Sequence, residues 1–370
     1  MFNSTPNVCV VGGGPAGLAA AIALKRIGCA VTVADCAVPP IDKACGEGLM
    51  PDSLLELRQL GIEIPDRTGF PFRGIRFADR YSSVCADFPS GLARGVRRTI
   101  LHDLLIERAM SLGLSMIWNA KHVQLDEGGI SLADRFLQAD LVVGADGQNS
   151  QIRRQAGLDE VTREKRRYGF RRHYRIAPWS SYMELYWGPR SQIYVTPVAA
   201  DEVCVAVISG NSKLRLEQAL SDFSELNRHL TGAEAVSTEM GALSVSRTLK
   251  SACRENVALI GDASGSVDAI TGEGICVSIK QAHALSASVA SGDIGQYQQF
   301  HRKLMKRPQQ MSSLMLMLER SGQLQRRALA GLAQHPAMFE SLLAIHVGAG
   351  RFRDLWCGEL FGFGRAFLAA

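Results

Sequence analysis

Short apolar runs that end at glycine or an acidic residue recur along the chain and predict buried parallel strands. The first run, 7–11, is followed by glycines and then by a helical spacing of apolar residues over 18–26. Gly28 ends that helix, and a second apolar run, 30–35, ends in an acidic residue. Strands that are buried on both faces form such continuous apolar runs, so this segment predicts a βαβ unit with parallel strands.

The same pattern returns twice in the later chain and extends this unit. The runs 139–143 and 257–260 are apolar, and each is followed by glycine and aspartate. Helical spacing covers 53–61 and 99–113, and the segment between these helices, 74–88, predicts a pair of strands. Together these elements predict an α/β framework.

The middle section of the chain has a different pattern, because its apolar residues are aromatic or β-branched and alternate with polar ones in places. This pattern predicts an antiparallel sheet inserted into the framework. The expected strands cover 168–176, 182–187, 192–198 and 202–209. From about residue 274 the spacing is mostly helical to the end of the chain.

Composition and charge fit a globular protein and narrow the range of partners. Of the 370 residues, 46% are hydrophobic and 21% are charged, which is enough apolar material for two or three structural units. The net charge of +5 accompanies no nucleic-acid-binding motif, so we expect no nucleic-acid partner. The nine cysteines form no CxxC pair, which indicates reduced thiols, a cytoplasmic location and no structural metal.

The distribution of apolar residues also argues against membrane insertion. The longest apolar run, 8–24, is interrupted by glycines and a proline, so we expect neither a transmembrane segment nor a signal peptide. In the helical tail, Met315 and Leu318 beside Arg326 and Arg327 would suit peripheral membrane contact. An ordinary helical core is the preferred interpretation of that tail.

A glycine-rich turn between the first strand and the first helix matches G-x-G-x-x-G in the context that dinucleotide binding requires. Its residues are Gly12, Gly14, Pro15, Ala16 and Gly17. Gly12 permits the tight turn, Gly14 lets a pyrophosphate approach the backbone, and Gly17 lets the helix pack close to the strand. Free N–H groups and the positive end of the helix dipole would face the phosphates.

Two later turns, together with this motif, resemble the signatures of a known family. Asp35 lies at the end of the second strand, where a carboxylate can accept hydrogen bonds from ribose hydroxyls. The later turns are Gly144-Ala-Asp-Gly147 and Val257-Ala-Leu-Ile-Gly-Asp-Ala-Ser264. In this order the three motifs resemble the aromatic hydroxylase superfamily of flavoproteins, typified by para-hydroxybenzoate hydroxylase. The resemblance covers roughly 7–290 and implies non-covalently bound FAD.

The resemblance implies further contacts with FAD. Asp262 would bind the ribityl or pyrophosphate part, and Asp146 with Gly147 would support the cofactor region. Arg98 matches an arginine that contacts the flavin nucleotide at the start of a long helix. Val123 falls where an adenine contact is usual.

Two further phrases are similar to geranylgeranyl reductases and their relatives, one branch of this superfamily. The first is Lys43-Ala-Cys-Gly-Glu-Gly48, and the second runs over 267–275. By this resemblance the backbone N–H groups of Gly272, Glu273, Gly274 and Ile275 face the flavin ring, where a helix dipole would stabilise the reduced form. The resemblance also places Cys45 and Gly46 in the loop over the flavin. Cys45 would then gate substrate or modulate the ring, or it is simply a small buried thiol.

Some residues near these phrases leave the chemistry open. Glu47 is either an active-site group or a loop charge, whereas a solvated loop charge is the preferred interpretation of Lys43. In the aromatic hydroxylases, the segment after the glycine-aspartate motif usually contains a histidine and a proline. Both are absent here, since Gly265 and Ala269 occupy that segment. Hydroxylase chemistry therefore does not transfer directly.

The resemblance implies an α/β fold in which a Rossmann-like, three-layer FAD-binding domain holds an inserted antiparallel substrate sheet and is followed by helices. The expected domains are two parts of the FAD-binding domain, a substrate sheet and a helical C-terminal region. The FAD-binding domain covers 1–165, which includes the small strand pair at 74–88, and 249–295. The substrate sheet covers 166–248, and the helical region covers 296–370.

The charged strand of the middle section contains polar candidates for the substrate pocket. Alternation places Arg171, His173 and Arg175 on one face and Arg172 and Tyr174 on the other. His173 or Tyr174 could orient or deprotonate a phenol, while about half of these charges would belong to a solvated outer face.

Tyr194 lies on a strand that in the family covers the active face of the flavin, and with Cys45, His173 and Tyr174 it completes the catalytic candidates. The leading expectation is a NAD(P)H-driven monooxygenase that uses O2 and a C4a-hydroperoxyflavin to hydroxylate a small apolar substrate, aromatic or polyketide-like. No second G-x-G-x-x-G unit is visible for NAD(P)H, which fits the superfamily.

Three alternatives stay open at this point. The first is a reductase of carbon–carbon double bonds in a prenyl or other apolar substrate, which the Cys45 phrase and Thr271-Gly-Glu-Gly274 favour. The second, a flavin halogenase, is disfavoured because the segment Trp-x-Trp-x-Ile-Pro is missing. The third is a flavoprotein that modifies a protein partner.

Overall fold

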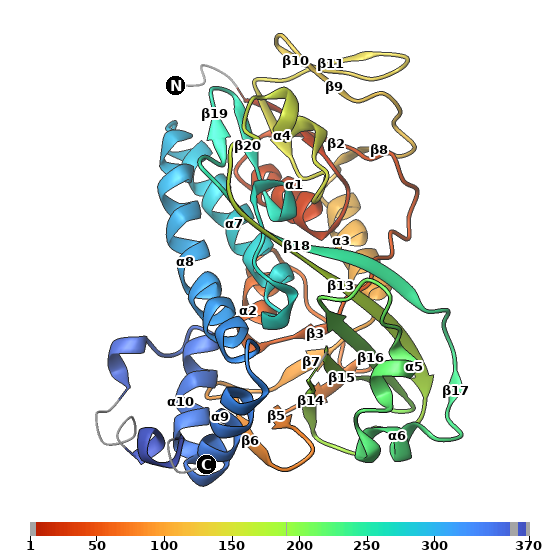
Figure 1. Ribbon diagram of the computed structural model, residues 1–370. Helices are drawn as coiled ribbons and strands as arrows, with labels where there is room; N and C mark the ends of the chain where they lie inside the picture. Colours follow the sequence, from red (N-terminus) through yellow and green to blue (C-terminus); the bar gives the residue numbers. More distant parts are fainter. Residues whose placement is uncertain (1–4, 190, 356–361, 368–370) are drawn as a thin grey trace.

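The computed structural model describes residues 5–189, 191–355 and 362–367. Its first layer is a six-stranded sheet (Figure 1). The strand order is β19 (Cys253–Arg254), β20 (Val257–Leu259), β12 (Leu141–Gly144), β1 (Asn7–Val11), β2 (Ala30–Ala34) and β8 (Ser115–Ile117). All neighbours pair in parallel except β19, which runs antiparallel to β20. The apolar runs of the sequence therefore do form a parallel sheet.

Helices cover the first sheet and complete its core. The covering helices are α1 (Pro15–Arg26), α3 (Arg98–Ser111) and α7 (Gly274–Ala290). Apolar residues of α1 and α7 pack against each other and against β1 in one buried cluster that includes Leu18, Ile22 and Leu285. On the other face, Cys9 and Val11 pack with the short helix α4 (Gln151–Gln155). Three strands near it form a small sheet of their own, β9 (Gln124–Asp126), β10 (Gly129–Ser131) and β11 (Phe136–Gln138).

The second large sheet is mostly antiparallel. Its strands are β5 (Gly74–Ala78), β6 (Ser83–Asp87), β13 (Val161–Arg175), β14 (Tyr182–Trp187), β15 (Ser191–Ala199), β16 (Glu202–Ser209), β17 (Glu234–Ala235) and β18 (Met240–Leu249). The pair β5 and β6 lies at one edge, where β5 pairs in parallel with β14. The strand pair expected at 74–88 is thus part of this sheet.

The longest strand pair joins the two sheets. β13 and β18 pair over nearly their whole length, and Figure 1 shows them as a ribbon that extends from the second sheet toward the first. The sequence predicts this strand only from residue 168, because 163–166 are all charged; in the structure 161–166 are exposed on both faces. Strand pairing, and not burial, holds that first part in place.

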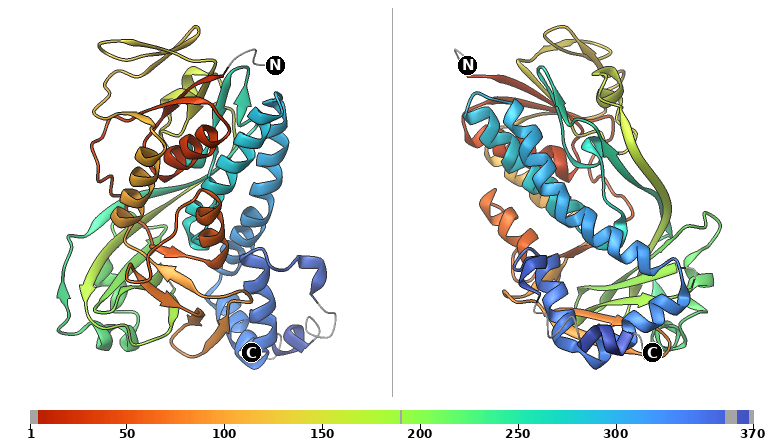
Figure 2. Two further views of the ribbon diagram at one scale, coloured as in Figure 1. Left: turned by 180° about the vertical axis from the view of Figure 1, so that it is seen from behind. Right: turned by 60° about the vertical axis from the view of Figure 1, so that its left-hand side comes forward.

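Helices lie on both faces of the second sheet. One face packs on α5 (Leu216–Leu220) and α6 (Ser224–Leu230), and the other packs on α9 (Gly322–Gln334) and α10 (Pro336–His346). Figure 2 shows α8 (Gly295–Leu318) running along one side of the molecule to these last helices. A three-stranded sheet and one helix complete the fold, namely β3 (Gly48–Leu49), β4 (Phe70–Phe72), β7 (Ala93–Gly95) and α2 (Pro51–Gln59).

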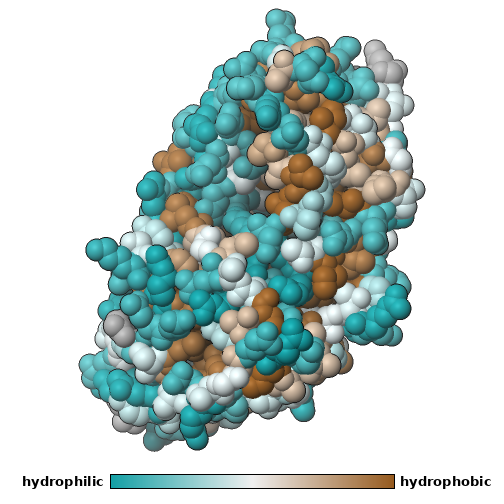
Figure 3. Space-filling view, turned by 90° about the vertical axis from the view of Figure 1, so that its right-hand side faces the viewer, coloured by the Kyte–Doolittle hydropathy of each residue, from teal (hydrophilic) through white to brown (hydrophobic). Residues whose placement is uncertain are grey.

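The expected fold class is therefore confirmed: a Rossmann-like sheet, an antiparallel sheet and C-terminal helices. Among the described residues, no helix combines the length and the apolar character needed to cross a membrane. In the face drawn in Figure 3, apolar side chains lie as separate patches among polar ones. In the tail, Met305 and Met311 are buried whereas Met317 is exposed, so these methionines belong in part to an ordinary core.

Candidate active site

A cavity of about 1000 Å³ lies between the two sheets. It is lined by the turn after β1, the end of β2, the segment before β3, the first residue of α3, the turn after β12, the inner face of β13 to β16, and the segment that leads into α7. Most residues singled out in the sequence line it: Gly12, Gly14, Pro15, Ala16, Asp35, Cys45, Gly46, Arg98, Val123, Asp146, Tyr194, Asp262, Gly272, Gly274 and Ile275. The separated motifs thus converge on one space.

The glycine turn has the geometry that the sequence predicts for phosphate binding. Gly12 has a φ of +110°, and a Cβ there would come 2.3 Å from the carbonyl oxygen of Ala145. A Cβ on Gly17 would come 1.8 Å from the oxygen of Gly12, so only glycine lets α1 approach this closely. Gly14 has open space around it, and α1 begins at Pro15 with no side chain capping its N–H groups. These groups face the cavity and suit an anion.

Asp35 and a histidine that the sequence interpretation missed hold this turn. Asp35 accepts hydrogen bonds from the N–H groups of Gly13 at 2.5 Å and Ala37 at 2.7 Å. His102 contacts the carbonyl oxygen of Gly13 at 2.8 Å through Nε2, and its Nδ1 accepts from the N–H of Ile41. The Nε2 atom therefore donates its proton to Gly13. Burial lowers the pKa of His102, in keeping with this neutral form.

Among the buried polar atoms of cavity-lining residues that lack hydrogen-bond partners in the described part of the chain, two fit FAD. They are Nε of Arg98 and Oδ1 of Asp146. Buried polar atoms are nearly always hydrogen-bonded, so a ligand is expected to bind them. The Arg98 guanidinium would pair with a phosphate, and Asp146 would accept from a hydroxyl. Its other oxygen accepts from the N–H of Gln151 at 2.6 Å.

Lys43 forms an ion pair at the cavity. Its Nζ lies 2.8 Å from Oδ2 of Asp262, and both residues line the cavity. The side chains are 42% and 31% exposed, so Lys43 keeps the solvent contact expected from the sequence and has a partner that the sequence did not reveal. Since Asp262 follows a strand of the first sheet and Lys43 precedes β3, this ion pair joins two walls of the site.

The segment that contains Cys45 is fixed by side chains of the second sheet. Arg171 of β13 pairs with Asp42 at 2.7 Å, and the hydroxyl of Thr196 donates to the carbonyl oxygen of Gly46 at 2.6 Å. The fixed backbone holds Cys45 at the cavity, where its Sγ accepts from the N–H of Glu47 at 3.4 Å. The loop is therefore held by partners that are distant in sequence.

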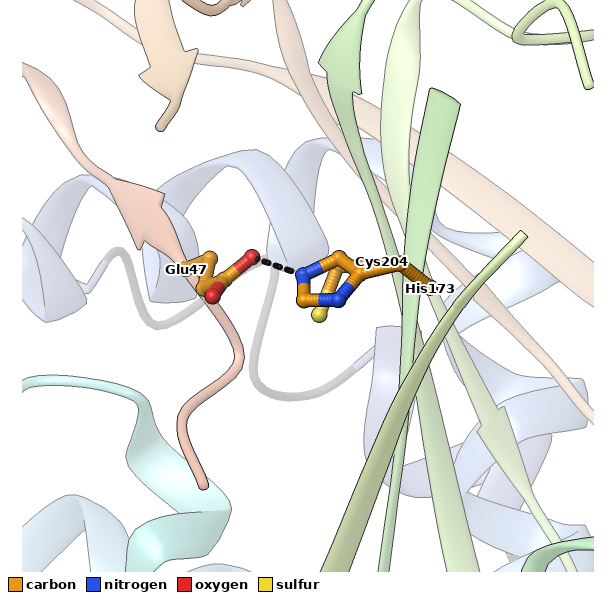
Figure 4. Close-up of side chains that lie close together, drawn as sticks. All are labelled: Glu47, His173 and Cys204. Atoms are coloured by element: carbon orange, nitrogen blue, oxygen red, sulfur yellow. Dashed lines mark hydrogen bonds and ion pairs between the residues drawn. The ribbon is translucent and has the colours of Figure 1, made fainter. Parts of the chain in front are cut away.

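Glu47, which follows Cys45 in the same segment, and His173 of β13 form a buried hydrogen-bonded pair (Figure 4). The Nε2 of His173 lies 2.7 Å from Oε2 of Glu47. One guanidinium nitrogen of Arg97 and one of Arg171 each lie 3.1 Å from Nδ1 of His173. Because guanidinium groups only donate, Nδ1 accepts and Nε2 donates its proton to Glu47. Glu47 has a φ of +58°, and its Oε1 accepts from the N–H of Arg98.

Cys204 lies beside this pair, and the three residue types would suit a metal ion (Figure 4). The contacts instead describe a hydrogen-bonded pair flanked by cations. The 2.7 Å contact between Glu47 and His173 is a hydrogen bond, and two guanidinium groups border the imidazole. Burial, followed by the charge of Glu47, raises the pKa of the Cys204 thiol well above its usual value, which favours the neutral thiol beside this pair.

The catalytic candidates of the charged strand separate in the structure. His173 is fully buried behind Glu47 and does not line the cavity. Tyr174 packs on the opposite face, in the apolar cluster beneath α5 and α6, so it cannot reach a substrate there. Arg175, expected on the face of Arg171, is exposed near the end of the sheet. Tyr194 does line the cavity, and its hydroxyl donates to the carbonyl oxygen of Ile270 at 2.6 Å.

The sequence match is consistent with this geometry. A family model described as an FAD binding domain matches residues 5–296. The chain belongs to this family. It is thus an FAD-dependent oxidoreductase, and the orphaned atoms of the cavity fit that cofactor.

Curated relatives include both reductases and a hydroxylase. The menaquinone reductase of Mycolicibacterium smegmatis is 28% identical over 326 residues, covering 80% of this chain and 79% of that protein. The geranylgeranyl diphosphate reductase of Synechocystis is 27% identical over 319 residues, covering 78% and 76%. The hispidin-3-hydroxylase of Neonothopanus nambi is 29% identical over 177 residues, covering 44% and 42%.

Solved structures share the fold over nearly the whole chain. A flavin-dependent brominase superposes with a TM-score of 0.78 at 17% identity and covers 99% of both chains. A 2-methyl-3-hydroxypyridine-5-carboxylic acid oxygenase superposes with a TM-score of 0.71 at 24% identity and covers 95% of this chain and 99% of its own. At these identities the likeness shows the fold alone.

Proposed function

We propose that this oxidoreductase reduces carbon–carbon double bonds of an apolar, prenyl-type substrate. The observation behind the proposal is the wall that the second sheet turns toward the cavity. Met183, Ala206 and Ile208 give this wall an apolar surface. Both nitrogens of His173 and the hydroxyl of Tyr194 already have hydrogen-bond partners within the protein. A phenol would therefore meet neither of these groups as a free base, whereas an alkene needs none.

The curated relatives support the same proposal. Two of them are named as reductases of menaquinone and of geranylgeranyl diphosphate, and both compounds contain a prenyl chain. Each covers about four-fifths of this chain, while the hydroxylase match covers 44% of it. The proposal thus favours the reductase over the monooxygenase that the sequence motifs put first.

The reaction adds two hydrogens to the double bond. Bound FAD, once reduced by NAD(P)H, would supply a hydride to one carbon. The other carbon takes a proton, and Cys45 is the candidate donor because it lines the cavity in a fixed loop. The N–H of Glu47 points to the sulfur at 3.4 Å and would stabilise the thiolate that remains, which then regains a proton from water.

An anaerobic experiment tests this proposal. Holoenzyme reduced with dithionite is mixed with geranylgeranyl diphosphate or a menaquinone in detergent micelles. We expect the absorbance of oxidised flavin to return. After air has oxidised any menaquinol back to menaquinone, mass spectrometry should still find two added hydrogens, and fragmentation should place them in the prenyl chain. Return of the absorbance with no hydrogenated product, or no return with either compound, would contradict the proposal.

Two cysteine variants examine the proton donor. Cys45→Ala should slow the substrate-dependent reoxidation of the flavin by about 100-fold, a usual contribution of a positioned acid. Cys85→Ala, at an exposed cysteine of β6 outside the cavity, should leave that rate unchanged. FAD content is measured in both variants, because loss of FAD would explain a slow Cys45 variant without any role in proton transfer.

Hydroxylation is the second candidate function, and the match to hispidin-3-hydroxylase is the observation that favours it. The two candidates differ in their use of oxygen. A hydroxylase consumes O2 in step with a product that gains one oxygen atom, whereas the proposed reductase forms its product under argon. Stoichiometric O2 consumption with an oxygenated product would select the hydroxylase.

A further inference from the structure

A second set of charged side chains lies behind the turn that leads into α7. Glu273 stands between Gly272 and Gly274, two residues that line the cavity. Its own side chain is only 4% exposed and contacts the C-terminal helices. Oε1 accepts from Nη2 of Arg307 in α8 at 3.0 Å, and Oε2 lies 3.6 Å from Nδ1 of His346 in α10. The backbone of Glu273 thus belongs to the cavity wall, and its charge belongs to the helical tail.

Neighbouring charges complete a buried group around this pair. Lys280 pairs with Asp52 at 2.7 Å, and Arg307 lies 3.7 Å from the same carboxylate. Burial lowers the pKa of Lys280, but the charges of Cys276 and Asp52 outweigh it, so the net shift is upward. Among the described residues, Oε2 of Glu273 and Nε of Arg307 lack hydrogen-bond partners. Charge, rather than hydrogen bonding alone, therefore dominates this contact.

The reacting ring of FAD would lie close to this group. Asp35 and the start of α1 would hold the nucleotide end, so the ring would extend to the opposite end of the cavity. Gly272, Gly274 and Ile275 line that end, and the positive end of the α7 dipole faces it. Two-electron reduction adds negative charge to the ring when fewer protons than electrons are taken up. Fixed charges at the start of α7 must then change the stability of the reduced form.

We propose that Arg307, by offsetting the charge of Glu273, sets the reduction potential of the bound flavin. Both are positioning residues, because neither side chain reaches the cavity. Arg307 and His346 lie beyond residue 296, where the family match ends. The C-terminal helices therefore tune the cofactor of the domain that precedes them. This inference depends on FAD binding and not on the proposed substrate.

Reduction potentials measured by anaerobic equilibration with a reference dye test the proposal. Arg307→Met leaves the Glu273 charge uncompensated, so the equilibrium constant for reduction should fall about tenfold. For a two-electron couple, this change is a shift of about 30 mV to lower potential. Glu273→Gln should shift the potential upward by a similar amount. The double variant should return close to the wild-type potential.

Two controls separate charge from structure. Arg307→Lys keeps the charge and should keep the potential, and Glu273→Gln alone carries the test if Arg307→Met loses FAD. Lys306→Gln removes an exposed charge from the same helix and should change the potential little. The proposal is overturned if the charge-removing variants retain FAD with an unchanged potential, if Arg307→Met and Glu273→Gln shift it in the same direction, or if Lys306→Gln shifts it as far as either.

Discussion

The two ends of the cavity are built in different ways. The end that would hold the nucleotide is formed by one βαβ unit over residues 7–35, and backbone groups make most of its contacts. The ring end depends on side chains that meet from distant parts of the chain. Its pairs are Asp42 with Arg171, Glu47 with His173, and Glu273 with Arg307. In the proposed orientation of FAD, a local motif would hold the nucleotide part of the cofactor, whereas tertiary packing would shape the part that reacts.

The strongest test of the nucleotide end is Gly17→Ala. The added Cβ would lie 1.8 Å from the backbone oxygen of Gly12, and no side-chain rotation relieves that contact. Forcing α1 away from β1 should cost about 3 kcal/mol or more. We expect at least about 100-fold weaker FAD binding, measured by titration of the apoprotein.

Gly14→Ala is the matched variant, because a Cβ at Gly14 meets no atom within 4 Å. This variant should unfold at nearly the wild-type denaturant concentration and still bind FAD more weakly, since the methyl group occupies the approach of the phosphates. If Gly17→Ala kept both its stability and its FAD affinity, the close contact of α1 with the turn would not matter as argued.

The C-terminal region should make the protein sensitive to acid through His301. This residue of α8 contacts the hydroxyl of Ser264 at 3.0 Å, beside the turn that contains Asp262. Burial, with a smaller effect of Arg302, lowers the pKa of His301 to about 4 from 6.5. The unfolded chain therefore binds the proton more tightly, and stability falls as the pH drops below about 6.5. The free energy of unfolding should decrease by about 3 kcal/mol between about pH 7 and pH 4.

Urea unfolding at several pH values checks this expectation, with His301→Gln as the control. The glutamine can still hydrogen-bond Ser264 but does not titrate, so its stability should depend less on pH. His102 at the nucleotide end also has a lowered pKa and should add an effect of the same sign. An unchanged pH dependence in His301→Gln would assign the acid sensitivity to other groups.

This contrast explains what the sequence could predict. The glycine turn and Asp35 lie within one short unit, so their spacing alone indicated a nucleotide site. The ion pairs of the ring end join residues such as Glu47 and His173, which no local pattern connects. The partner of Lys43 was missed for the same reason, because Asp262 is far along the chain.

Tyr174 and His102 show what the local sequence pattern could not predict about the site. Tyr174 alternates with His173, but alternation alone does not reveal which face meets the cavity and which meets helices. His102 lies one helical turn after Arg98, on the same face of α3. That spacing was the available signal for its role beside Gly13.

A smaller effect is expected from Asp35→Asn. The amide keeps one acceptor for the turn but loses the charge that strengthens hydrogen bonds to the backbone and to ribose hydroxyls. Such bonds contribute about 1.5–3 kcal/mol, so FAD affinity should fall about 10- to 100-fold. Asp126→Asn, an exposed acid on β9, should leave FAD affinity unchanged. Equal affinities for both variants would mean that backbone groups alone hold the adenosine.

The smallest predicted effect is at the ring end, where Tyr194→Phe removes one buried hydroxyl. The carbonyl oxygen of Ile270 then loses its 2.6 Å partner in the turn before Gly272, which should lower the free energy of unfolding by about 1 kcal/mol. FAD affinity should change less than about threefold, because the nucleotide end provides most of the binding. Tyr182→Phe removes an exposed hydroxyl that donates to Asp87, and it should cost less than about 0.5 kcal/mol. A large loss of FAD in Tyr194→Phe alone would place the ring end, and not the glycine turn, in control of cofactor retention.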